Sequence, residues 1–117
     1  MAIQTQEQKD WEASLEEEIR NMSPSEMMDF IPEEVLRLIA KGFLAGMRGP
    51  KKYEKNNWMT LDLDAETDIW PSFHRHIRQW FDGGLDPDTG MQYVEPFIMA
   101  RSIMFCYFSE RNRANNI

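Results

Sequence analysis

Four stretches of the chain repeat their apolar residues with the period of an α-helix, and proline or glycine marks where they begin or end. A period of about 3.6 residues places such side chains on one face of a helix, which can be buried against a neighbour. The stretches are residues 6–21, 32–47, 65–82 and the region that follows residue 90. A chain of 117 residues has room for one hydrophobic core. The pattern therefore predicts an all-α fold, a compact bundle of about four to five helices.

The segment 23–26, Ser-Pro-Ser-Glu, adds a short helix, because it has the pattern of a capping box with proline at the first helical position. Residues 23–111 are predicted to form the helical core domain, and residues 112–117 a disordered tail. Residues 48–64 lack sustained helical periodicity, so we expect a long ordered connection there, with strand character near residues 59–63. Gly42 and Gly46 lie one turn apart and indicate a close helix crossing.

Residues 1–22 are predicted to form a separate acidic amphipathic helix. Its apolar stripe is narrow and its opposite face is acidic; the stripe consists of Trp11, Leu15, Ile19 and Met22. This helix could pack on the core of its own domain or on a second subunit. We therefore expect an oligomerisation or packing arm, and a homo-oligomer or dimer.

The charge of the chain bears on its partners. Thirteen basic residues against twenty acidic ones give a formal net charge of −7, which disfavours direct binding of nucleic acid. The N-terminal residues have no basic and apolar leader pattern, and no apolar run approaches the roughly 20 residues of a membrane span. We expect a cytoplasmic protein that does not bind membranes. The single cysteine, Cys106, lies in an apolar stretch and is expected to be a buried thiol.

The segment 51–58, Lys-Lys-Tyr-Glu-Lys-Asn-Asn-Trp, combines cations, amide groups and aromatic rings within eight residues. Such a set suits the phosphates and the base of a nucleotide, with Lys51, Lys52 and Asn57 as polar contacts and Trp58 as a stacking surface. The alternative is a plain loop that Tyr53 and Trp58 anchor to the core. Both interpretations remain open from the residues alone.

Arg101 and the two histidines are further candidates. Arg101 projects onto the apolar face of the last helix, so it requires an anion, either a carboxylate of a neighbouring helix or a phosphate of a ligand. His74 and His76 diverge by about 200° on a helix and cannot chelate one metal ion together. Each is either a hydrogen-bonded histidine beside the core or a group that transfers a proton or contacts a phosphate. Arg75 points to the exposed side of the same helix.

Several carboxylates near helix ends could hold a hard cation, and we select Glu34 and Asp86 as ligands of Mg²⁺, or of Mn²⁺. The sequence shows no glycine-rich phosphate loop, no serine or cysteine nucleophile motif and no cysteine and histidine metal spacing.

From about residue 31 to residue 108, the order of motifs resembles phage-encoded dATP/dGTP diphosphohydrolase-type domains, small all-α domains akin to MazG-like nucleotide pyrophosphohydrolases. The shared motifs are Gly-Pro-Lys-Lys-Tyr with Asn57-Trp58, then Arg75-His76, then Asp-Pro-Asp-Thr-Gly at 86–90. The family pattern continues with His-Leu-x-His, where this chain has Tyr-Val-Glu-Pro at 93–96.

The resemblance implies a purine deoxynucleotide as ligand, metal-assisted hydrolysis and a host cytoplasm as location. It implies catalytic roles for His76, Asp86 and Asp88. Together with Arg101 it implies a substrate-binding set of Lys51, Lys52, Tyr53, Asn57, Trp58 and Arg75, and Gly90 as scaffold. The alternative is a non-catalytic acidic phage protein that inhibits or sequesters a host protein through its first helix. A third interpretation is nucleotide binding without hydrolysis.

Overall fold

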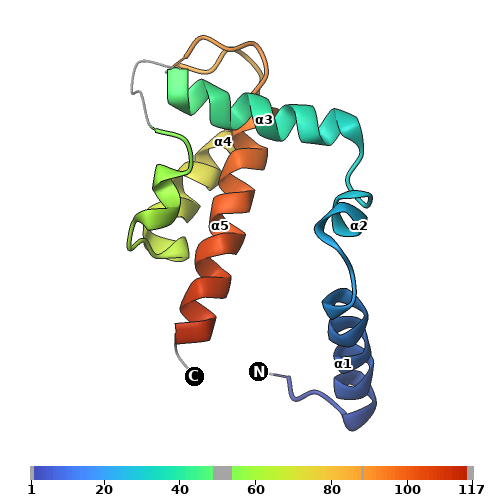
Figure 1. Ribbon diagram of the computed structural model, residues 1–117. Helices are drawn as coiled ribbons and strands as arrows, with labels where there is room; N and C mark the ends of the chain where they lie inside the picture. The colour runs from blue at the N-terminus through green and yellow to red at the C-terminus, as the bar shows by residue number, and fades with distance from the viewer. Residues whose placement is uncertain (1, 49–53, 88, 116–117) are drawn as a thin grey trace. The chain divides into compact units, whose positions relative to one another are not determined.

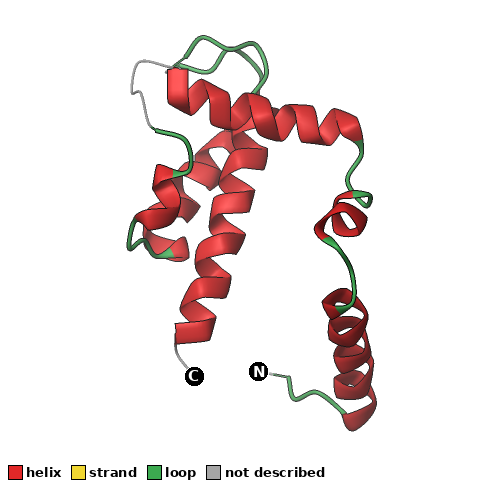
Figure 2. Ribbon diagram, viewed as in Figure 1, coloured by secondary structure: helices red, strands yellow, loops and turns green. Residues whose placement is uncertain are grey.

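The computed structural model describes residues 2–48, 54–87 and 89–115, and these residues form helices and loops without a strand (Figure 2). The predicted all-α class is confirmed. The α-helices are α1 (Gln6–Arg20), α2 (Pro24–Met28), α3 (Glu33–Arg48), α4 (Trp70–Asp82) and α5 (Glu95–Asn115). A 3-10 helix, η1 (Asn57–Thr60), and a π-helical turn, η2 (Ala65–Ile69), precede α4. The chain divides into two units, Met1–Glu33 and Glu34–Ile117.

The N-terminal unit is built from two capped helices. At α1 the Thr5 hydroxyl accepts from the Gln8 backbone at 3.1 Å, and the Gln8 side chain accepts from the Thr5 backbone at 2.8 Å. Ser23 and Glu26 form the same reciprocal pair at α2, as the sequence predicted. No residue of α1 is buried. The helix is therefore specified by its cap, without support from burial of its apolar stripe.

The core of the C-terminal unit lies where α4, η2 and α5 pack together, side by side in Figure 1. Its buried residues are Ala65, Ile69, Met104 and Phe108. Along α5 every fourth residue is buried in the series Pro96, Ala100, Met104 and Phe108, which is one ridge of the helix.

Helix α3 crosses α5 near the N-terminal end of α5 (Figure 1). Gly42 is buried, and a Cβ atom built on it would lie 2.1 Å from the carbonyl oxygen of Pro96 and 3.0 Å from the Cβ of Ala100. The predicted close crossing is confirmed at Gly42. It is wrong for Gly46, where no atom that the helix of Gly46 packs against in the described part of the chain lies within 4 Å of such a Cβ.

The connection before α4 is held against α5 by one arginine. The Arg111 guanidinium donates to the carbonyl oxygens of Leu61 at 2.9 Å and Met59 at 3.4 Å, and it lies 4.6 Å from the ring centre of Phe108. The expected strand character near residues 59–63 is wrong, because the backbone turns through η1 and its carbonyls bond to Arg111 instead of a neighbouring strand.

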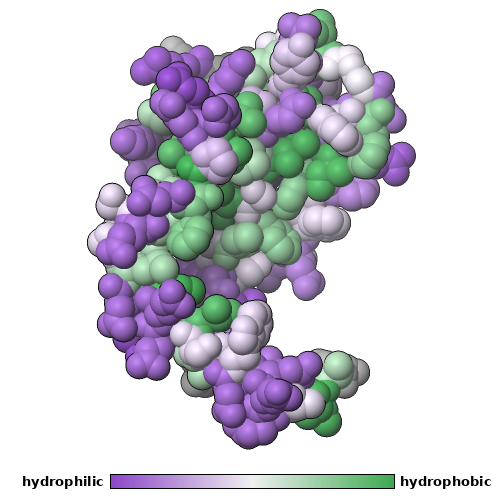
Figure 3. Space-filling model, turned by 90° about the vertical axis from the view of Figure 1, so that its right-hand side faces the viewer, coloured by the Kyte–Doolittle hydropathy of each residue, from purple (hydrophilic) through white to green (hydrophobic). Residues whose placement is uncertain are grey.

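Three expectations about exposure are corrected. Cys106 is exposed rather than buried, because it lies about 200° around α5 from the buried Met104 and Phe108. By helical period Trp80 and Phe81 share the apolar face of residues 65–82 with Ile77 and are expected to be buried, but both are exposed. Figure 3 shows hydrophobic side chains reaching the surface among hydrophilic ones. No helix in the described ranges is long and apolar enough to cross a membrane.

Candidate functional site

His76 is the buried residue of α4. Its side chain is 5% exposed, and its ring stacks on Phe97 of α5 with centroids 5.2 Å apart. Nδ1 of His76 lies 2.9 Å from Oε1 of Gln79, one turn further along α4. With that oxygen as acceptor, Nδ1 carries the proton and Nε2 remains a proton acceptor.

Asp86 begins the turn that leads towards α5, and it is 2% exposed. Its Oδ2 accepts hydrogen bonds from the backbone nitrogen and the hydroxyl of Thr89, both at 2.8 Å. The Asp86 carbonyl also accepts from Gly90 at 2.7 Å, where a φ of 75° favours glycine. The second carboxylate oxygen, Oδ1, is buried and has no hydrogen-bond partner within the described part of the chain.

The pKa of His76 is shifted by its burial and by charged residues of α4, α5 and the turn after α4. Burial, the largest effect, lowers the pKa of His76 below its ordinary value of about 6.5. The Gln79 hydrogen bond opposes this, the positive charges of Arg101 and Arg75 lower the pKa further, and the Asp86 carboxylate raises it. Arg101 is half-buried on α5, with Nη1 3.2 Å from the Met104 sulfur. We call His76, Asp86 and Arg101 the His76 cluster.

The lowered pKa of His76 predicts how stability depends on pH. The unfolded chain binds a proton on this histidine at a higher pH than the folded chain, so acidification favours unfolding. We expect the melting temperature of wild type to fall between pH 7.5 and pH 5.5 by more than that of His76→Gln. Differential scanning fluorimetry at both pH values measures this difference. His74→Gln alters an exposed histidine of the same helix and should keep the wild-type pH dependence; equal slopes in all three proteins would contradict the prediction.

Trp58 lies inside an aromatic group about three turns further along α5. Its ring stacks on Phe43 at 5.7 Å and meets Tyr107 and Phe108 edge-on at 5.1 and 5.9 Å. This packing fits the anchoring interpretation of the sequence. Asn57 is exposed and its carbonyl accepts from the Thr60 hydroxyl at 2.7 Å. Lys51, Lys52, Tyr53 and Asp88 lie outside the described residues.

The structure places the two expected metal ligands in different settings, since Glu34 is exposed and Asp86 is buried. Among the described residues, no three histidine, cysteine, aspartate or glutamate side chains are grouped so that they could hold a metal ion. Arg75 is exposed on α4, beside the His76 cluster whose histidine it influences.

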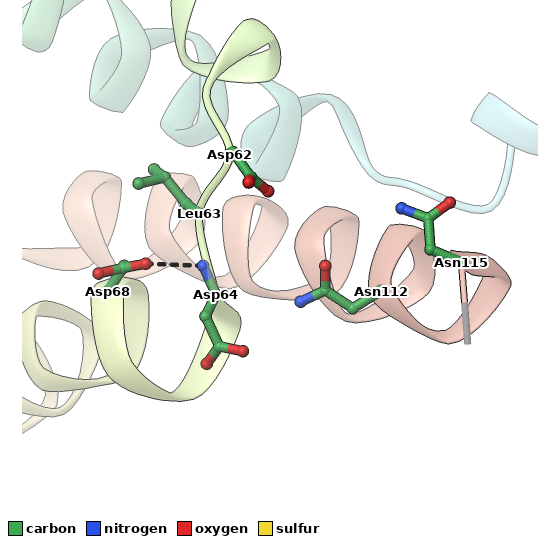
Figure 4. A pocket seen from close by; sticks show the side chains of 6 residues that line it. All are labelled: Asp62, Leu63, Asp64, Asp68, Asn112 and Asn115. Carbon is green, nitrogen blue, oxygen red and sulfur yellow. Dashed lines mark hydrogen bonds between the residues drawn. The ribbon is translucent and has the colours of Figure 1, made fainter.

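A cavity of about 390 Å³ opens away from these residues. Figure 4 shows its lining, and the carboxylates there do not converge on one point; the lining residues are Asp62, Leu63, Asp64, Asp68, Asn112 and Asn115. Asp64 caps η2 by accepting from the backbone of Glu66 and Thr67, and Asp68 accepts from the Asp64 backbone at 2.7 Å. Local structure therefore accounts for two of the three carboxylates.

Sequence reasoning missed Gln79, Thr89 and Phe97, which contact His76 or Asp86 of the His76 cluster. A signal existed for two of them. Gln79 follows His76 by three residues on a helix, and Thr89 follows Asp86 by three residues in a turn, which are both spacings that allow local hydrogen bonds. Phe97 gave no signal, because its contact with His76 depends on how α4 and α5 pack.

A family model described as "dATP/dGTP diphosphohydrolase, N-terminal" matches residues 5–116. The match includes every residue of the His76 cluster and the connection before α4. No curated protein and no solved structure matches the chain.

Proposed function

The chain belongs to the dATP/dGTP diphosphohydrolase N-terminal family, and on that premise we propose that it binds a purine deoxynucleoside triphosphate and hydrolyses it with the help of a divalent metal ion. The proposal rests chiefly on one observation. Arg75 and Asp86, from two of the motifs that resemble the family, lie close enough to His76 to influence its pKa, and Asp86 holds a buried carboxylate oxygen without a hydrogen-bond donor in the described residues.

The basic residues in and beside the His76 cluster would neutralise the negative charge of the phosphates. Arg75 is exposed and Arg101 is half-buried, and both lie close enough to His76 to lower its pKa. Lys51 and Lys52, outside the described residues, would add two further cations to the triphosphate site. Because burial keeps His76 neutral near pH 7, its Nε2 can accept a proton from water that attacks a phosphoryl group.

The described residues do not form a metal site by themselves, so the metal ion would have to arrive with the nucleotide. Mg²⁺ is commonly held by one or two carboxylates together with substrate phosphates and water. Asp86 would supply Oδ1, which has no hydrogen-bond partner among the described residues, and Glu34 is the second metal ligand proposed from the sequence. When bound, such an ion polarises the phosphoryl group and neutralises its charge.

The direct test is a panel of deoxynucleoside and ribonucleoside triphosphates with Mg²⁺ or Mn²⁺. We expect release of pyrophosphate or phosphate from dATP or dGTP, and a higher melting temperature with the same nucleotides, because a ligand that binds the folded state stabilises it. Binding without release would support the nucleotide-binding alternative. Neither release nor stabilisation with any nucleotide would refute the proposal.

A further inference from the structure

The net charge of the chain is concentrated in one unit. Residues 1–33 hold nine acidic and two basic residues, which gives −7, whereas residues 34–117 hold eleven of each and are formally neutral. The N-terminal unit therefore has a distinct electrostatic character, beyond what solubility of the whole chain would require.

The same unit exposes an apolar stripe. Trp11 is 67% exposed, and Leu15 and Ile19 on the next two turns of α1 are exposed as well. An exposed apolar stripe on a helix marks an interaction surface when it is bordered by polar residues.

The borders of the stripe are acidic on both sides. At about 100° per residue, Glu12 and Glu16 fall along one border of the stripe and Glu7 and Glu18 along the other. The two cations of α1, Lys9 and Arg20, project beyond Glu16, roughly 80–100° from Ile19, and the side opposite the stripe carries Asp10 and Glu17. Neighbouring carboxylates such as Glu12 and Glu16, four residues apart, repel one another and weaken the free helix.

The negative charge of the N-terminal unit indicates which kind of partner can bind this apolar stripe. A second copy would bring two units of −7 together, and an anionic lipid surface would also be repelled. We propose that α1 binds, as an amphipathic helix, in an apolar groove of another protein that is bordered by lysine or arginine. This binding function is additional to nucleotide hydrolysis. Trp11, Leu15 and Ile19 enter the groove, and the bordering carboxylates pair with its basic rim.

The test uses the full chain and two synthetic helical hairpin peptides that share a leucine-lined groove. One hairpin has lysine at the positions that border the groove, and the other has glutamate there. By calorimetry we expect the lysine hairpin to bind at least about tenfold more tightly, a preference that shrinks in salt. Equal affinity for both hairpins would overturn the proposal.

Two sets of variants locate the surface. Trp11→Ala with Leu15→Ala should weaken binding of the lysine hairpin by about tenfold or more, and Glu12→Gln with Glu18→Gln should reduce the preference for lysine while the apolar stripe stays intact. Phe81→Ala removes an exposed ring of α4 and should leave binding unchanged. Binding that survives the Trp11 and Leu15 changes would contradict the proposal, as would self-association of the chain through α1 or equal binding to anionic phospholipid vesicles.

Discussion

Gly42→Ala is expected to destabilise the protein strongly, whereas the same change one turn later, Gly46→Ala, is expected to stabilise it slightly. The new Cβ at residue 42 would lie 2.1 Å from the Pro96 carbonyl oxygen and 2.8 Å from its carbon, so α3 must move away from α5. Neither atom belongs to a side chain that could rotate aside. Overpacking of this kind costs roughly 1–3 kcal/mol, and sometimes more.

Helix propensity acts in the opposite direction and makes the pair of variants informative. Alanine is favoured over glycine inside a helix by about 0.5–1 kcal/mol. At residue 46 no packing neighbour among residues 2–48, 54–87 and 89–115 lies within 4 Å of the added atom, so this gain should dominate. The two variants should therefore differ in sign, although their chemistry and helix are the same.

Thermal unfolding followed by circular dichroism measures both effects. A loss of 1 kcal/mol lowers the melting temperature of a domain this small by roughly 4–8 °C. If Gly42→Ala melts at or above the temperature of Gly46→Ala, the close approach of α3 and α5 at this position is wrong.

The sequence predicted the helices well because their signals are local. Proline marked the beginnings of α2 and α3, a capping pair added to the signal at α2, and α1 begins at the residue that the apolar period indicated. The predicted helix 65–82 appears as η2 and α4, because Asp64 and Asp68 hold the first turn in a wider π geometry. Four residues of the predicted disordered tail, 112–115, continue α5.

Faces of helices were predicted less well, because they depend on partners distant in sequence. The aromatic residues of α4 share one face by helical period, and that period alone could not show that His76, at the border of this face, is buried while Trp80 and Phe81 are exposed. The burial of His76 follows from Phe97, which stacks on it from α5. The exposure of Cys106 follows in the same way from the ridge that α5 buries.

The residues predicted for the candidate site also fall into two groups, those near His76 and those that pack in the core. The order of the motifs indicated Arg75, His76 and Asp86 as candidate site residues. In the structure Arg75 and Asp86 lie close enough to His76 to influence its pKa. By contrast, Trp58 belongs to the same motif series but packs among Phe43, Tyr107 and Phe108. A shared motif thus includes residues that hold the fold together as well as residues available to a ligand.

Asp86→Asn is expected to separate stability from function. The substituted side chain keeps an oxygen that can accept from the backbone and hydroxyl of Thr89, so the turn at 86–90 should persist. It replaces the buried, unpartnered Oδ1 of a carboxylate with a neutral amide. Because an unsatisfied buried charge costs more than an unsatisfied neutral group, the melting temperature should stay the same or rise.

The hydrolytic activity of Asp86→Asn should fall even though its melting temperature does not. If Oδ1 of Asp86 contributes a ligand to the nucleotide-bound metal ion, the amide cannot replace its charge, and metal-dependent turnover should fall by roughly 10²–10⁴-fold. The stabilisation by nucleotide with Mg²⁺ should be lost as well. Asp82→Asn makes the same charge change at the exposed end of α4 and should retain both properties. Full turnover in Asp86→Asn would remove Asp86 from the site, whereas a large fall in its melting temperature would show that the carboxylate serves the fold.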